Sequence, residues 1–349
     1  MVNDFQTMRP LKLVGGHGSP YSRKMRAVLR YRRIGFRWIM RGSYADVGIP
    51  PVPVALIPLL VFPGRDGSAD EAMIDSTFQI KRLESMYPER SLTPHDPALA
   101  FLHAILEDYA DEWLTKPMFH YRWKYEADIQ KASHVLALDR DLHLSREQLA
   151  KLSTLFAERQ IARLRVVGSN EITTPVIEDS YRRILHLLDD HLKAGSYFLM
   201  GTRPGVGDFG LFGQLSQLAH FDPTPSAIAA RETPRVVSWV SHLDDLSGLE
   251  IGEWTSRDQL APTLLGFFTE IGRVYAPFLI ANARALNSHA ERVECEIDGR
   301  PWIQQPFPYQ AKCLKWMREG YAALAASDRK FVDSYLAGTG ADTIFTAAI

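Results

Sequence analysis

Two parts of the chain follow different hydrophobic patterns, and this change limits the possible folds more than any other feature. Strand-like and helix-like segments alternate up to residue 87. Their predicted order is a strand at 11–14, a helix at 19–33, strands at 36–40, 55–62 and 72–74 with a turn at 64–67, and a helix at 75–87. This order is typical of a small α/β domain, which we place at residues 11–92, after a tail at 1–10.

A polar linker that contains two prolines, Thr93–Pro97, ends this domain. From Ala98 to Leu246, apolar residues recur at three- and four-residue steps, which is the spacing of one face of a helix. We therefore expect an all-helical second domain at residues 98–250.

The start of the helical domain carries an acidic run and an aromatic cluster. The acidic residues lie off the apolar stripe, and we interpret them as a solvated face rather than an acid/base pair. They are Glu107, Asp108, Asp111 and Glu112. The aromatic residues could line an apolar substrate pocket, but at helical spacing such residues more often pack in a core. They include Trp113, Phe119, Tyr121 and Trp123.

The last part of the chain, residues 251–349, has a third pattern. A helix is predicted at 263–285, and two alternating segments flank Asp298–Gly299, a typical two-residue hairpin turn, so we expect a hairpin near 292–305. A further helix at 309–325 then precedes a short tail. Because this extension is too aromatic for a disordered tail, we expect an ordered cap on the helical domain.

Charge and composition exclude several classes of protein. Forty basic and 41 acidic residues give a net charge of −1, so the basic excess of a dedicated nucleic-acid-binding protein is absent. The longest nearly apolar run, Val52–Phe62, contains prolines and is shorter than the roughly 20 residues of a membrane span, so we expect no transmembrane helix. The histidines and the two cysteines, Cys295 and Cys313, lack metal-ligand spacing, so we expect no metal. Without a signal-sequence pattern, we expect a cytoplasmic protein.

The strand-to-helix turn Gly18-Ser19-Pro20-Tyr21-Ser22 is the first candidate site. Unpaired N–H groups and the helix dipole at such a turn favour an anion, and a thiolate would be stabilised there. The hydroxyl of Ser19 could donate a hydrogen bond to a thiolate and lower its pKa. The alternative is that Ser19 or Ser22 only caps the helix.

Two further candidates follow in the same domain. Ile57–Pro58 places a proline in an apolar strand, either because a cis bond turns the backbone of Ile57 toward an extended peptide, or because the strand is an edge strand or begins at Leu59. Asp75–Ser76 directly precedes a helix, where the hydroxyl and backbone amides could hold a carboxylate and Asp75 could meet an ammonium. Either residue could equally be a helix cap.

In this order and at this spacing, the three motifs resemble the glutathione-binding half of the cytosolic glutathione transferase family. The resemblance covers about residues 11–245 and includes a helix start at Gly205–Asp208, where glycine replaces the family's serine or threonine. It implies a thioredoxin-like N-terminal domain, an all-α C-terminal domain and a homodimer, with the extension added.

The resemblance also implies a role for each candidate residue. Ser19 would be the catalytic partner of the glutathione thiolate, Ile57 would pair with the tripeptide backbone, and Pro58 would be the cis-proline. Asp75 and Ser76 would hold the γ-glutamyl end. Because serine stands where thiol-disulfide members of the family have cysteine, disulfide exchange on glutathione is disfavoured.

We therefore expect an enzyme that activates the thiolate of glutathione, its co-substrate, for attack on a small hydrophobic electrophile. The alternative is a non-catalytic binding or scaffold protein with the same fold. The residues leave open whether Ser19, Tyr21 or Ser22 contacts the thiolate. The segment 42–54, in which prolines crowd the end of the family's usual second helix, is not expected to form that helix.

Overall fold

The computed structural model describes residues 9–64 and 68–349, so most of the predicted turn at 64–67 and most of the predicted tail lie outside it. The N-terminal domain is built on a four-stranded mixed sheet in the order β2-β1-β3-β4. Strand β1 pairs parallel with β2 and antiparallel with β3, which pairs antiparallel with β4. The elements are β1 (Leu11–Gly15), α1 (Pro20–Tyr31), β2 (Phe36–Met40), β3 (Leu59–Phe62), β4 (Glu71–Met73) and α2 (Ser76–Met86).

Local sequence explains this domain. The crossover between the parallel strands β1 and β2 is α1, which begins with Pro20 at its first position, where a missing N–H costs nothing. Met25, Val28 and Leu29 on α1 are fully buried, and so are all four residues of β3. The domain therefore has the predicted thioredoxin-like α/β arrangement.

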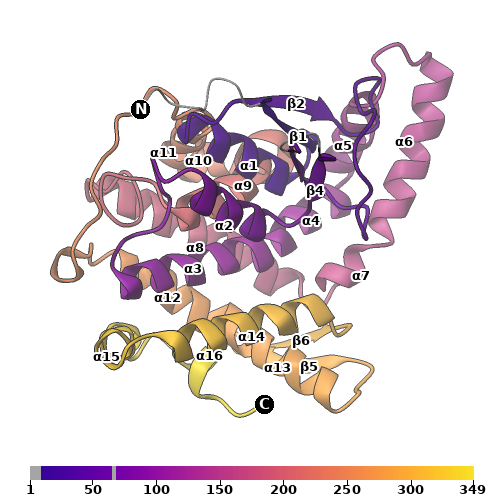
Figure 1. The fold of residues 1–349 in the computed structure, drawn as a ribbon. Coiled ribbons are helices and arrows are strands. Elements are labelled where there is room, and N and C mark those ends of the chain that lie inside the picture. Colours follow the sequence, from indigo (N-terminus) through magenta and orange to yellow (C-terminus); the bar gives the residue numbers. More distant parts are fainter. Residues whose placement is uncertain (1–8, 65–67) are drawn as a thin grey trace, which may run out of the picture.

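The middle of the chain is helical, as the apolar period predicts. Its first helix, α3, is capped by Asp96, whose Oδ1 accepts hydrogen bonds from the backbone N–H groups of Ala98 (2.9 Å) and Leu99 (3.2 Å). The α5–α6 hairpin projects from one side of the molecule (Figure 1). The elements are α3 (Pro97–Glu112), α4 (Thr115–Lys124), α5 (Glu126–Leu138), α6 (Arg146–Ile161), α7 (Leu164–Val167), α8 (Thr174–Lys193), α9 (Val206–Ser216), η2 (Gln217–Phe221), α10 (Pro223–Glu232) and α11 (Pro234–Leu243).

The C-terminal extension is ordered and contains an antiparallel hairpin in which Cys295 faces Trp302. The predicted short tail after the helix at 309–325 is wrong, because two more helices follow; there Phe345 stacks on Tyr321 with ring centroids 4.7 Å apart. The elements are η3 (Arg257–Gln259), α12 (Leu264–Glu270), η4 (Ile271–Tyr275), α13 (Ala276–Asn287), β5 (Val293–Ile297), β6 (Arg300–Gln304), α14 (Pro308–Ala323), α15 (Ala326–Leu336) and α16 (Thr343–Thr346).

The extension shares one hydrophobic core with the rest of the chain. In Figure 1 its helices α12–α16 and its hairpin lie, in orange and yellow, on the side of α3 away from the sheet, and α14 and α15 pack against α3. Trp302 of the hairpin is fully buried, and its ring centroid lies 5.4 Å from that of Trp113, at the end of α3. The core cluster runs without interruption from Leu13 in the sheet to Ile344 in α16.

One helix in the described part of the chain, Leu264–Asn287, is long and apolar enough by length and composition to cross a membrane. Of its apolar window, 61% is buried inside the molecule. Phe267, Phe268 and Phe278 of this helix are fully buried members of the shared core. These contacts are those of a central core helix, for which apolar composition is expected.

Candidate functional site

Ser19 caps the first helix at the end of β1. Its Oγ accepts a hydrogen bond from the backbone N–H of Ser22 at 3.2 Å. Among the described residues, the Ser19 hydroxyl donates no hydrogen bond, and the side chain is partly exposed. The structure therefore leaves the Ser19 O–H available as a donor at a helix N-terminus.

Tyr21 and Ser22, the two other candidates for a thiolate contact, point into the protein. The Tyr21 hydroxyl donates to the backbone carbonyl of Asp111 at 2.7 Å. Ser22 is fully buried, and its Oγ lies 3.4 Å from the backbone N–H of Gly16, from which it accepts. Of the three candidates, only Ser19 presents a free hydroxyl donor at the surface of the turn.

The turn before Ser19 is fixed by the helical domain. Arg122 of α4 donates to the carbonyl of Gly18 at 2.6 Å and pairs with buried Asp222 at 2.8 Å. Glycine is required where β1 meets the turn, because a Cβ on Gly15 would lie 2.5 Å from Ser22 Oγ and 2.9 Å from the Trp38 ring. Helix α1 therefore begins at one defined place.

The Ile57–Pro58 peptide bond is cis, and β3 begins at Leu59. The cis bond and the strand start at Leu59, which the sequence offers as alternatives, are therefore both present. Gln79 of α2 donates to the carbonyl of Pro58 at 2.9 Å and to that of Met73 at 2.7 Å. On the other side, a Cβ on Gly16 would lie 3.5 Å from Ile57 Cδ1. Ile57 and Pro58 thus lie between the Ser19 turn and α2.

Asp75 and Ser76 form the N-terminus of α2. Asp75 is the cap residue, with φ of +75°, a conformation that a non-glycine residue rarely adopts, and its Oδ1 accepts from the N–H of Thr77 at 3.1 Å. Its Oδ2 is occupied as well, because Tyr309 of α14 donates to it at 2.6 Å. Ser76 is only 6% exposed and its Oγ lies 3.5 Å from Lys24 Nζ.

A buried lysine joins the parts of this site. Lys24 of α1 is 0% exposed, and its Nζ donates to Glu107 Oε1 and to Asp111 Oδ2 on α3, each at 2.6 Å. Thr77 Oγ1 also donates to Glu107 Oε1 at 3.2 Å. Lys24 of α1 thus contacts both α2, through Ser76, and α3, through Glu107 and Asp111.

The N-terminal domain matches a known family model. Residues 13–91 match the model of the glutathione S-transferase N-terminal domain. The chain carries a glutathione S-transferase N-terminal domain. No curated protein matches the chain.

Several solved structures similar to this chain are of glutathione S-transferases. One is an enzyme from Methylobacterium radiotolerans in complex with glutathione sulfonate, at 18% identity over 68% of this chain and 91% of that chain, with a TM-score of 0.40. Another is a family member from Pseudomonas fluorescens with two glutathione bound, at 15% identity over 76% and 95%, with a TM-score of 0.39. A third is a Tau class enzyme from mango, at 18% identity over 67% and 88%, with a TM-score of 0.40.

The prediction that the acidic run on α3 is a solvated face is wrong. Glu107 is 5% and Asp111 7% exposed, because both contact Lys24 of the N-terminal domain. The extension covers the rest: Tyr275 donates to Asp108 Oδ2 at 2.5 Å, and Gln310 donates to the backbone carbonyl of Glu112 at 3.0 Å. Residues off the apolar stripe are therefore buried by polar partners from other elements.

Burial changes the proton affinity of this acidic group. Desolvation and the neighbouring carboxylates raise the pKa of Glu112 to about 8 and that of Asp108 to about 7. Burial also raises the pKa of Asp111, to about 6, against the attraction of Lys24. For Lys24 burial acts to lower the pKa, but the carboxylates of Asp111 and Glu107 outweigh it and raise the pKa above its ordinary value.

The aromatic cluster of the helical domain is core. Trp113, Tyr121 and Trp123 are at most 2% exposed, and Phe119 is partly buried and packs against the same core. The core interpretation is therefore confirmed. The helix start at Gly205 also forms without a serine or threonine hydroxyl, because Asp208 accepts from the N–H groups of Gly205 and Leu199, each at 2.9 Å.

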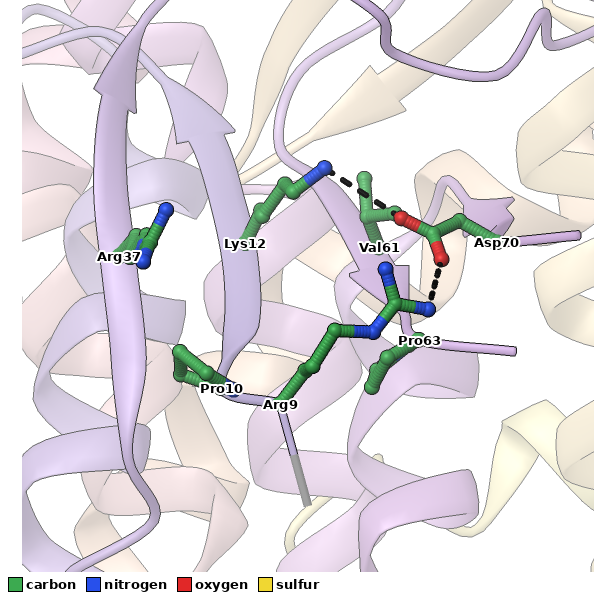
Figure 2. Close-up of a pocket in the computed structure, with 7 residues that line it drawn as sticks. All are labelled: Arg9, Pro10, Lys12, Arg37, Val61, Pro63 and Asp70. Carbon is green, nitrogen blue, oxygen red and sulfur yellow. Dashed lines mark hydrogen bonds and ion pairs between the residues drawn. The ribbon is translucent and has the colours of Figure 1, made fainter. Parts of the chain in front are cut away.

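A cavity of about 190 Å³ lies away from the candidate residues, beside the start of β1 and the end of β3. In Figure 2, Arg9 and Lys12 both reach Asp70, at 2.8 and 3.3 Å, while Arg37 lies on the neighbouring strand. None of the predicted site residues lines it. Within residues 9–64 and 68–349, no group of three or more His, Cys, Asp or Glu side chains could hold a metal ion.

Lys24 and Tyr309 are two of the residues at this site that the sequence did not single out. Lys24 shares the buried face of α1 with Val28 and Tyr31, at i+4 and i+7, and this spacing could have shown that it points inward. Tyr309 had no such signal, because its contact with Asp75 spans 234 residues of sequence.

Proposed function

We propose that the protein binds glutathione at the edge formed by the Ser19 turn, Ile57–Pro58 and the N-terminus of α2, and that it activates the thiol for attack on a small hydrophobic electrophile. One observation carries the proposal: Ser19 caps α1 within a matched glutathione S-transferase N-terminal domain, and its O–H has no acceptor among the described residues. A thiolate placed there would gain a hydrogen bond and the favourable end of the helix dipole.

The rest of the site supports the proposal. The carboxylate of Asp75 is partly exposed at the start of α2 and would pair with the ligand's α-ammonium, and the backbone N–H groups there would meet its carboxylate. The Ser76 hydroxyl is buried and lies close to Lys24, so it would bind only a ligand atom that touches it directly. Val54 and Leu56, which precede Ile57 in the chain, are 52% and 56% exposed and would offer an apolar surface to the electrophile.

Two further expectations belong to the same proposal. A homodimer follows from the family resemblance, and sedimentation of the purified protein tests it. A cytoplasmic location is supported by the cysteines, because Cys295 and Cys313 are both free thiols and disulfides are uncommon in that compartment.

Calorimetric titration with glutathione tests the binding part of the proposal. Asp75→Asn keeps an oxygen for the helix cap but removes the charge, so we expect glutathione affinity to fall by about 10- to 100-fold. Asp333→Asn is the matched control, since Asp333 also accepts from a tyrosine hydroxyl, that of Tyr321 at 2.6 Å, but on α15. Equal affinity in both variants would favour the plain helix-cap interpretation of Asp75.

A non-catalytic binding or scaffold protein is the second candidate, and one observation favours it. Residues 41–58, all described by the structure, contain no helix or strand, so the family's usual second helix is missing beside the site. Tyr44 and Val47 in this segment are 96% and 70% exposed. Retention on immobilised glutathione without a thiolate absorbance in the complex would favour this candidate over the enzyme.

A further inference from the structure

A tyrosine of the C-terminal extension contacts the end of the site where the ligand's ammonium would bind. Tyr309, in the first turn of α14, donates its phenol O–H to Asp75 Oδ2 at 2.6 Å. Asp75 Oδ1 accepts from the N–H of Thr77 at 3.1 Å. With one bond on each oxygen, the plane of the carboxylate is fixed.

The extension holds Tyr309 in place. Its ring packs edge-on against Trp316, with centroids 5.9 Å apart, and Trp316 packs in the same way against Phe78 of α2 at 5.2 Å. The neighbouring residue, Gln310, is buried and donates to the carbonyl of Glu112 on α3. A shift of the start of α14 away from Asp75 would therefore disturb the ring contact of Trp316 with α2 and the hydrogen bond of Gln310 with α3.

The contact still leaves room for a ligand cation. A carboxylate offers about four lone-pair sites, and the N–H of Thr77 and the phenol of Tyr309 use two of them. The phenol oxygen also keeps lone pairs of its own. Burial and the nearby carboxylate of Asp75 raise the pKa of Tyr309, so the phenol remains a neutral donor. The contact thus orients the charge of Asp75 without neutralising it.

We propose that Tyr309 is a positioning residue for the ammonium-binding end of the glutathione site. This inference rests on the proposed function. Tyr309 fixes the carboxylate of Asp75 in the orientation that receives the α-ammonium of the γ-glutamyl group, so the extension completes the site. Because this end of the ligand is remote from the thiol, Tyr309 contributes to the binding of ammonium-bearing ligands and not to activation of the thiol.

The test compares two ligands in the full-length protein. Glutathione and its analogue without the α-ammonium, glutaryl-cysteinylglycine, are titrated calorimetrically into the wild type and Tyr309→Phe. We expect the substitution to weaken glutathione binding about tenfold and analogue binding by less than about twofold. The pKa of the bound glutathione thiol, followed by ultraviolet absorbance, should stay the same.

Tyr335→Phe is the matched control, because Tyr335 is a partly buried tyrosine of the same extension whose hydroxyl has no hydrogen-bond partner within residues 9–64 and 68–349. It should leave both affinities unchanged. An equal loss of affinity for both ligands in Tyr309→Phe would mean that Tyr309 has only a structural role. Unchanged glutathione affinity would mean that Tyr309 has no role, and tighter binding would mean that it competes with the ligand. Each of these results overturns the inference while the proposed function stands. A wild type that binds no glutathione would overturn both.

Discussion

The function of the N-terminal domain can be inferred from its sequence motifs, whereas that of the C-terminal extension cannot. The two regions are nevertheless in contact, through Tyr309 and Asp75. The N-terminal domain carries short motifs with a local physical reason, such as the helix-capping serine at Ser19, and residues 13–91 match a family model. The extension lies outside that match and carries no functional motif. It nevertheless supplies Tyr309 to Asp75 and Tyr275 to Asp108.

A boundary in sequence pattern is not a boundary in packing in this protein. Trp302 and Leu336 of the extension belong to the same core cluster as Leu13 of the sheet. The extension is therefore part of the folded unit, and it contacts the candidate site through Tyr309. An extension that folded as an independent addition would respond differently to the substitutions that follow.

The largest effect is expected from Trp302→Ala. The indole is fully buried, 5.4 Å from the Trp113 ring and 6.0 Å from that of Phe278, so truncation should cost about 4 kcal/mol of unfolding free energy. Trp316→Ala is the control, since Trp316 is 37% exposed and should cost much less. Denaturant unfolding should remain a single transition; an early transition confined to the extension, with the rest unchanged, would contradict the shared core.

A slightly smaller effect is expected from Lys24→Met. The substitution leaves the carboxylates of Glu107 and Asp111 buried without their ammonium, which should cost about 3 kcal/mol at pH 8. At pH 5 the loss should be smaller, because the buried carboxylates can then take up protons. Lys151→Met, at an exposed lysine of α6, is the control. Chemical unfolding at both pH values measures the difference, and equal losses would exclude the electrostatic explanation.

Local features were predictable from the sequence, and contacts between distant segments were not. The cap at Ser19, the hairpin at Asp298–Gly299 and the interruption at Pro58 each depend on a few neighbouring residues. The acidic run was misinterpreted because periodicity shows only that Glu107 lies off the apolar stripe, and not that Lys24 lies opposite. The same limit hid Tyr309.

A pH effect on stability is expected from Glu112, whose pKa burial raises to about 8. Between about pH 5 and 7 the folded protein holds a proton that the unfolded chain has lost, so the unfolding free energy falls as pH rises. A single such group contributes up to about 1.4 kcal/mol per pH unit.

In Glu112→Gln this fall in unfolding free energy should be smaller, whereas Glu296→Gln, at an exposed position of the hairpin, should match the wild type. Thermal unfolding across this range gives the slopes, and equal slopes in wild type and Glu112→Gln would mean that Glu112 is not protonated in the folded protein.

The pKa of the thiol of bound glutathione tests whether Ser19 activates that thiol. In the wild type, ultraviolet titration of the complex should give a pKa below that of free glutathione, and in Ser19→Ala the value should rise by about one unit, since one charge-assisted hydrogen bond is lost. Ser145→Ala controls for the lost helix cap, because Ser145 accepts from the N–H of Gln148 at 3.2 Å, as Ser19 does from Ser22, but on remote α6. It should leave the thiol pKa unchanged. Equal thiol pKa values in the wild type and Ser19→Ala would contradict the claim that Ser19 activates the thiol.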